Sequence, residues 1–274
     1  MSKTKTIHFF RHAQAKHNAW SEDDLVGEDV RDTSLTRLGI DQAKAILTSA
    51  SVTNFRSPTL LISSPLRRCL QTALYAFHPH FNENLKATME KNKDFPQGSI
   101  PRKAIQKLFK KGNIKWEADP RIMECVNGRD SWAHYPTPVE ELPPEIREVF
   151  TFPDDLFTGE KNEEWLERQG MYKDYTLRRG AWGRVNRFYD YLYQRPEDEI
   201  IVVAHEQLLK DYLFPSPWEK PIPNACGHSF TVKWEVQTTP KVQKKKTKEL
   251  EFVMHMEEIK PRSVKVFKKT ERNS

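Results

Sequence analysis

Residues 8–18 read HFFRHAQAKHN, an apolar run that ends abruptly in arginine, two histidines, a lysine and an asparagine. Residues 4–10 favour a β-strand, and in a strand Ile7 and Phe9 share one face. A strand end this rich in cations and hydrogen-bonding groups is either an ordinary surface turn or a pocket for an anion such as phosphate. Which of the two applies depends on what other strand ends bring to the same place.

Two more apolar runs predict buried strands that lead directly into polar residues. Residues 59–63 (TLLIS) are short and apolar, as buried parallel strands are. Ser64 and Pro65 follow them, a capping residue and a residue suited to the first helical position, so a helix is expected to begin there. Residues 200–204 (IIVVA) are the clearest buried strand of the chain, and they end at His205.

Apolar residues at helical spacing mark the segments between these strands. A helix with Ser34 or Thr36 as its cap has the apolar stripe Ile40, Ala43, Leu47 and Ala50. The next helix has the stripe Leu66, Leu70, Ala73 and Phe77. Residues 163–180 and 208–214 also favour helices. Residues 181–194 predict a helix that buries Val185, Phe188, Tyr189 and Leu192.

The alternation of strands and helices predicts an α/β fold, a three-layer α/β/α sandwich around a mainly parallel central sheet. Two late alternating runs, residues 230–236 and 250–256, predict an antiparallel pair. The expected organisation is a single domain (residues 1–260) with insertions near residues 80–118 and 130–165 and a basic tail (residues 261–274). In such sheets ligands bind at the carboxyl ends of the strands, where Arg11, His12 and His205 fall.

The composition is that of a globular chain: 274 residues, of which 37% are hydrophobic and 30% charged. No apolar run approaches the ~20 residues that span a bilayer, and the first residues leave no room for a signal peptide. Cys69, Cys125 and Cys226 are odd in number and lack CxxC spacing, so neither a disulfide framework nor a zinc site is expected. We expect the three cysteines to be small buried residues. The expected location is the cytoplasm, with the nucleus as a second candidate.

The formal net charge is +6 and the isoelectric point is about 9.0. Much of the excess lies in residues 241–248 and 260–269, and lysine runs of this kind are more typical of solvated linkers than of recognition elements. Nucleic acid is therefore not the expected partner, although these C-terminal segments could contact it. No membrane partner is expected.

Several segments combine into a candidate site that consists of Arg11, His12, Asn18, Arg68, Glu124 and His205. Five motifs surround these residues in chain order: RHAQAKHN (11–18), LTRLGIDQA (35–43), SPLRRCLQTA (64–73), IMEC (122–125) and VVAH (202–205). In these motifs the chain resembles the histidine phosphatase superfamily, in its phosphoglycerate-mutase-like branch. The resemblance covers residues 6–73 and two islands, near Glu124 and near His205.

The resemblance implies a reaction as well as a fold. It makes His12 the nucleophile that forms a phosphohistidine and Glu124 the acid that protonates the leaving group. It assigns phosphate binding to Arg11, Asn18, Arg68 and His205. These residue types suit the chemistry, because a neutral imidazole can attack phosphorus and a guanidinium matches the phosphate oxygens. No metal ion and no cofactor is implied, since side chains supply the positive charge.

Other residues near the candidate site have alternatives. Arg67 lies 100° further round the helix than Arg68, so it is expected to face elsewhere. The acid stays open among Glu124, Glu117, Asp119 and Asp130. His8 and His17 are expected to be structural or solvent-facing.

Two positions depart from the family pattern. Ala13 stands where a glycine commonly follows the nucleophile, which would strain the loop if its φ had to be positive. Glu206 stands where a glycine commonly follows the third site, and a carboxylate in a phosphate pocket would repel the substrate. Because side chains alternate faces along a strand, we expect Glu206 to point away from the pocket.

The predicted function is a metal-independent phosphatase that hydrolyses a phosphorylated small molecule. A mutase of the phosphoglycerate type is the first alternative, although Arg129, Arg178 and Arg179 do not align convincingly with the carboxylate-binding residues of such mutases. The second alternative is a non-catalytic member of the family that binds a protein or a nucleic acid. The substrate and the oligomeric state are not predicted.

Overall fold

The computed structural model describes residues 3–19, 32–48, 58–83, 114–124, 136–153, 178–214, 220–236 and 252–258. The predicted tail at residues 261–274 lies outside these ranges, as do parts of both predicted insertions. Cys125, Arg129 and Asp130 also lie outside the described residues, and so does most of the helix predicted over residues 163–180.

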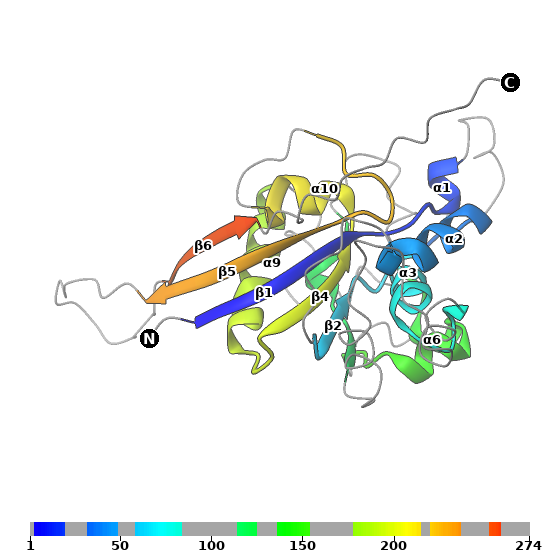
Figure 1. Cartoon of the computed structure of the whole chain (residues 1–274), viewed down its shortest axis with the longest axis horizontal. Helices are drawn as coiled ribbons and strands as arrows, with labels where there is room; N and C mark the ends of the chain where they lie inside the picture. Colours follow the sequence, from blue (N-terminus) through cyan, green and yellow to red (C-terminus); the bar gives the residue numbers. More distant parts are fainter. Residues whose placement is uncertain are drawn as a thin grey trace, which may run out of the picture.

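Six strands form one sheet in the order β3-β2-β4-β1-β5-β6 (Figure 1). The strands are β1 (Lys3–Arg11), β2 (Leu60–Ser63), β3 (Lys115–Ala118), β4 (Glu199–Ala204), β5 (Gly227–Val236) and β6 (Phe252–Glu258). β1 to β4 run parallel, whereas β5 is antiparallel to β1 and β6 is antiparallel to β5. The predicted mainly parallel sheet and the late antiparallel pair are therefore confirmed. β3 was not predicted, because its sequence KWEA contains no apolar run.

The helices are α1 (Lys16–Ala19), α2 (Arg37–Ala45), η2 (Ile46–Thr48), α3 (Arg67–Phe77), η3 (Pro120–Ile122), η5 (Val139–Glu141), α6 (Pro144–Val149), α9 (Arg178–Gln194), α10 (Glu206–Leu208) and the π-helical turn η6 (Leu209–Leu213). The helix predicted over residues 181–194 is confirmed within α9. The helix predicted over residues 208–214 begins two residues earlier, as α10. α6 lies in a proline-rich stretch without a clear apolar period and was not predicted. Among the described residues, no helix combines the length and the apolar character that crossing a membrane requires.

Helices cover both faces of the sheet, in agreement with the predicted three layers (Figure 1). α2, α3 and α6 pack on the face that presents Phe10, Leu61 and Val203. α9 and η6 pack on the opposite face, which presents Ile7 and Phe9. Neighbouring strand residues point to opposite faces, so a continuous apolar run feeds both cores. Each large apolar side chain that is fully buried contributes about 1.5–3 kcal/mol.

The carboxyl ends of three parallel strands lie side by side. The amide of His12, which follows β1, donates to the carbonyl of Ala204 at the end of β4, over 2.9 Å. The amide of Ser64, which follows β2, donates to the carbonyl of Val203, also over 2.9 Å. His205 directly follows the last residue of β4. The strand register therefore delivers an imidazole, a hydroxyl and a second imidazole to one place.

Side chains of α2 and α3 hold the loop that follows β1. The amide of Ala13 donates to Oγ1 of Thr72, and the amide of Gln14 donates to Oε1 of Gln42, both over 2.9 Å. Gly39 lies so close to this loop that a Cβ atom there would collide with the carbonyl oxygen of Gln14. These residues of the two helical motifs thus serve to hold the loop in place.

The two helices begin with different caps. Thr36 is the N-cap of α2, and its hydroxyl accepts a backbone amide proton, which confirms one of the two predicted caps. The predicted Ser64 cap of α3 is wrong: Leu66 is the N-cap residue and makes no side-chain cap bond. The first amide of α3, that of Arg67, donates instead to Oδ1 of Asp32 over 2.6 Å. A carboxylate from a distant segment thereby takes the role of the local serine.

Replacing Gly39 by alanine tests the contact between α2 and the loop. We expect Gly39→Ala to lower the free energy of unfolding by about 2 kcal/mol or more, because a backbone carbonyl must move to admit the methyl group. Leu38→Ala on the same helix is the matched control, since Leu38 is 54% exposed and its loss costs about 0.5 kcal/mol or less. Chemical denaturation measures both variants, and equal effects would contradict the contact.

Candidate active site

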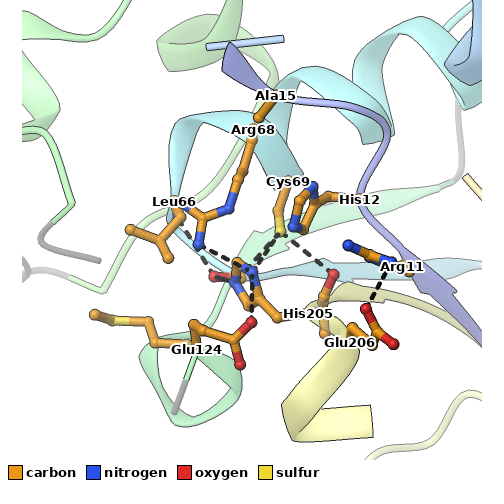
Figure 2. A network of polar contacts seen from close by, with 12 residues as sticks. Arg11, His12, Ala15, Leu66, Arg68, Cys69, Glu124, His205 and Glu206 are labelled. Atoms are coloured by element: carbon orange, nitrogen blue, oxygen red, sulfur yellow. Dashed lines mark hydrogen bonds and ion pairs between the residues drawn. The ribbon is translucent and has the colours of Figure 1, made fainter. Parts of the chain in front are cut away.

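A pocket of about 320 Å³ opens beside the carboxyl ends of β1 and β4. Its described lining consists of Arg11, His12, His17, Asn18, Glu124, Glu206, Gln207, Lys210 and Asp211. Four of the six predicted site residues belong to this lining. The other two, Arg68 and His205, are fully buried next to it (Figure 2). The structure therefore brings all six predicted residues together.

His12 is 3% exposed and its ring is oriented by its own loop. Nδ1 lies 2.8 Å from the carbonyl oxygen of Ala13, so this nitrogen carries a proton and donates it. Burial holds the pKa of His12 well below its ordinary value, and the positive charge of Arg68 lowers this pKa further. The lowered pKa favours the neutral ring, and the contact of Nδ1 with Ala13 then leaves the lone pair on Nε2.

Arg68 and His205 form the buried side of the site. Nη2 of Arg68 lies 3.3 Å from Nδ1 of His205, and Nε2 of His205 lies 2.8 Å from Oγ of Ser64. Because a guanidinium only donates, this arrangement assigns the lone pair of His205 to Nδ1 and the proton to Nε2. The rings of His12 and His205 are 5.3 Å apart between centroids. The thiol of Cys69, buried as predicted, lies 3.4 Å from Nε2 of His205.

Arg11 and Asn18 line the open side of the pocket. Nη1 of Arg11 donates to the carbonyl of Ile222 over 2.6 Å and lies 2.7 Å from Oε2 of Glu206. The carbonyl oxygen of the Asn18 side chain accepts from the amide of Ala15 over 3.1 Å. The NH₂ end of Asn18 is then the donor that this residue offers to a ligand. Both residues lie in the pocket, as the sequence predicted, and Arg11 already forms an ion pair with Glu206.

Glu124 is the candidate acid that reaches the site. Its Oε2 lies 3.8 Å from Nδ1 of His205, and its side chain is 13% exposed, in the pocket wall. Glu117 instead pairs with Arg195 over 2.9 Å, and Asp119 accepts from the guanidinium two residues further along over 2.7 Å. Neither of these two carboxylates lines the pocket. Between Glu124 and its two described rivals, the geometry favours Glu124.

The prediction that Glu206 points away from the pocket is wrong. Its carboxylate lies in the pocket wall and forms the ion pair with Arg11 (Figure 2). The alternation of strand faces does not apply to Glu206, because β4 ends at Ala204 and Glu206 begins α10. A backbone amide, that of Ile222, also donates to Oε1 of Glu206 over 3.3 Å. Nζ of Lys210 lies 3.8 Å from the same oxygen, so Arg11, the Ile222 amide and Lys210 all hold this carboxylate.

The structure adds pocket residues that the sequence reasoning missed. His17, expected to be structural or solvent-facing, lies in the wall, with Nδ1 at 2.6 Å from Oγ1 of Thr33. Gln207, Lys210 and Asp211 follow the third site on α10 and η6. The spacing was the available signal, because Lys210 lies four residues after Glu206 and Asp211 four after Gln207, and residues three to four apart share a helix face. Within the described ranges, no group of three or more His, Cys, Asp or Glu side chains is arranged to hold a metal ion.

Sequence-based predictions also concern Ala13 and Arg67, two further residues near the site. Among the described non-glycine residues, only Asp32 and Ala225 have positive φ, so the loop accommodates Ala13 without left-handed backbone. Arg67 faces away from His205, as predicted, and its Nη2 donates to Oγ1 of Thr137 over 2.9 Å.

The comparisons with known proteins agree with the resemblance seen in the sequence. A family model described as "Histidine phosphatase superfamily (branch 1)" matches residues 7–89. A phosphoglycerate mutase-like protein of Arabidopsis thaliana is 27% identical over 223 residues, which is 78% of this chain and 75% of the relative. Over residues 7–89 the chain is thus similar to the histidine phosphatase superfamily, as its motifs predict.

Solved structures give more distant matches. A phosphoglycerate mutase of Bacillus anthracis has 15% identity and a TM-score of 0.43, covering 84% of this chain and 88% of its own. An alpha-ribazole phosphatase of Shigella flexneri has 16% identity and a TM-score of 0.41, covering 85% and 91%. Likeness at these TM-scores bears on neither the activity nor the substrate of this chain.

The ion pair between Glu206 and Arg11 predicts how the pocket binds anions. We expect Glu206→Gln to bind inorganic phosphate about tenfold more tightly, because the variant removes a negative charge within a few ångströms of the ligand. Ile222 still holds Arg11 in this variant. Asp211→Asn is the matched control, an acid of the same wall without a contact to Arg11. Calorimetric titration with phosphate measures both, and equal gains would mean that net charge, not the ion pair, sets the affinity.

Proposed function

We propose that this protein is a phosphatase that hydrolyses the phosphomonoester of a small molecule through a phosphohistidine on His12. The observation that carries the proposal is the buried imidazole of His12, whose Nδ1 is held on the carbonyl oxygen of Ala13 so that Nε2 is left with the lone pair. Arg68 and His205 lie beside it, so a phosphate bound there would meet a nucleophile and donors together. Preorganised cations around a transferring phosphoryl group stabilise its transition state.

In the first step, Nε2 of His12 attacks phosphorus. The new P–N bond forms while the bond from phosphorus to the leaving oxygen breaks, and the carboxyl of Glu124 gives its proton to that oxygen. Arg11, Arg68 and the NH₂ group of Asn18 are the donors for the phosphate oxygens, and His205 joins them when Nδ1 is also protonated. The alcohol then leaves with the proton that Glu124 supplied.

In the second step, water replaces the alcohol. The Glu124 carboxylate takes a proton from water as the water oxygen attacks phosphorus, and the P–N bond to His12 breaks. Inorganic phosphate leaves, and both His12 and Glu124 return to their starting protonation states. The same carboxyl group thus acts as acid and then as base.

Glu206 favours a phosphatase over a phosphoglycerate mutase. A mutase must hold the carboxylate of phosphoglycerate as well as its phosphate, whereas here a protein carboxylate already pairs with Arg11. A second anionic group on the substrate would meet Glu206 and Asp211 in the same wall, where the one lysine of the described lining, Lys210, already lies 3.8 Å from Glu206. Like charges at short range cost several kcal/mol when water is scarce, so a substrate with one anionic group is favoured.

Turnover of p-nitrophenyl phosphate tests the proposal. We expect hydrolysis that resists EDTA and that falls about a thousandfold or more in His12→Ala, because this variant lacks the nucleophile. His17→Ala is the matched control, since it removes a pocket imidazole that is held on Thr33 and should keep most of the rate.

Other outcomes would favour the other candidate functions. Phosphate exchange between phosphoglycerates without release of phosphate would show a mutase. No turnover of either kind, together with salt-sensitive binding of nucleic acid, would favour a non-catalytic binding protein.

The pH dependence should report the lowered pKa of His12. A base whose pKa is lowered stays unprotonated into more acidic solution, so the acid limb of kcat/KM should lie below His12's ordinary value of 6.5 once ionisation of the substrate is taken into account. Arg68→Met should lower the rate and also move this limb upward, since it removes the second cause of the shift. A limb above pH 6.5 in the unmodified protein would contradict a buried neutral nucleophile.

A further inference from the structure

Arg184, in the middle of α9, is a charged residue that the proposed reaction does not use. It is 1% exposed, and its side chain reaches the segment that carries Glu124. Nη1 lies 3.0 Å from the carbonyl oxygen of Met123, 3.4 Å from that of Pro120 and 3.5 Å from that of Arg121. One buried guanidinium nitrogen therefore lies within 3.5 Å of three backbone carbonyl oxygens in the segment 120–123.

These carbonyls belong to η3 and to the residue after it, directly before Glu124. The last carbonyls of a helical turn have no partner within the turn, and a cation at that end stabilises them. The other end of η3 is held separately, because Oδ1 of Asp119 accepts from the amide of Arg121 over 2.9 Å. Arg184 thus adds a side-chain contact to the bond from the Met123 amide to the Pro120 carbonyl, at the end of the turn from which the Glu124 backbone departs.

The position of Arg184 also links two parts of the site. α9 leads through a short connection into β4, and β4 ends at His205. Val185 and Phe188 of the same helix are buried against the sheet, so Arg184 is attached to a rigid part of the core. The Glu124 segment is therefore tied, through one guanidinium, to the element that precedes the third site.

We propose that Arg184 is a positioning residue that holds Glu124 at the distance from the leaving group needed for proton transfer. This inference rests on the proposed function, in which Glu124 is the acid. The contacts described for Arg184 reach the backbone of residues 120–123, and we infer that it acts through them. A side chain with this role affects the protonation of the leaving group more than the attack on phosphorus.

Two substrates separate positioning from a general structural role. p-Nitrophenol leaves readily as an anion, whereas glycerol must be protonated as it leaves. We expect Arg184→Lys to lower kcat/KM for glycerol 2-phosphate about tenfold more than for p-nitrophenyl phosphate. Glu124→Gln should change the two substrates in the same pattern, and the double variant should show little additional loss on glycerol 2-phosphate.

Arg187→Lys is the matched control, an exposed arginine of α9 three residues further along. It should leave the ratio of the two kcat/KM values unchanged. Arg184→Met, of similar length but uncharged, is the second variant in case Arg184→Lys does not fold. Thermal unfolding of each variant checks the fold before the kinetics are measured.

Each outcome decides the proposal. A changed ratio in a folded Arg184 variant supports positioning. An equal loss on both substrates, or failure of both Arg184 variants to fold, assigns Arg184 to stability alone and overturns it. If the unmodified protein hydrolyses neither substrate, the proposed function fails and this inference falls with it. An unchanged ratio with active unmodified protein rejects only the inference about Arg184.

Discussion

The site depends on a guanidinium that is buried completely at the N-terminal end of a helix. Arg68 is the second residue of α3, and helix N-termini carry partial positive charge, so the two add where a phosphate would bind. A buried cation costs several kcal/mol unless the surroundings compensate. The fold compensates in part with Asp32, whose carboxylate accepts from the first amide of α3 and is attracted by Arg68. Burial raises the pKa of Asp32, and its hydrogen bonds oppose that rise.

Burial and the charge of Arg68 together lower the pKa of the neighbouring His12 imidazole. His12 is buried beside Arg68, and both conditions disfavour a second positive charge on the ring. Its Nδ1 is committed to a backbone carbonyl, which leaves a lone pair at the other nitrogen. His205 is fixed between Ser64 and Arg68. In the proposed reaction the charge of Arg68 would bind the phosphate and would also help the burial of His12 to keep the nucleophile unprotonated.

Much of this site could be predicted from the sequence because its parts follow strands. An apolar run that stops at a polar residue marks a strand end, and parallel strands end on the same edge of the sheet. Arg11, His12 and His205 were found in this way, whereas the family resemblance selected Arg68 and helix geometry then predicted that Arg67 faces elsewhere. Glu206 was misplaced, because the rule of alternating faces was carried past the point where the strand ends. β3 and α6 were missed because neither shows a clear apolar period, and contacts with neighbouring elements stabilise them.

The sequence alone determined the α/β class, the order of the elements and the residue types that gather at one end of the sheet. These follow from local periodicity and from the geometry of parallel strands. Only the tertiary structure decided that Glu206 forms an ion pair with Arg11, that Asp32 caps α3 and that Arg184 contacts the backbone before Glu124. Each of these contacts joins residues whose separation in space depends on packing between elements. Local sequence patterns carry no information about such distances, because the packing of the helices against the sheet sets the distances.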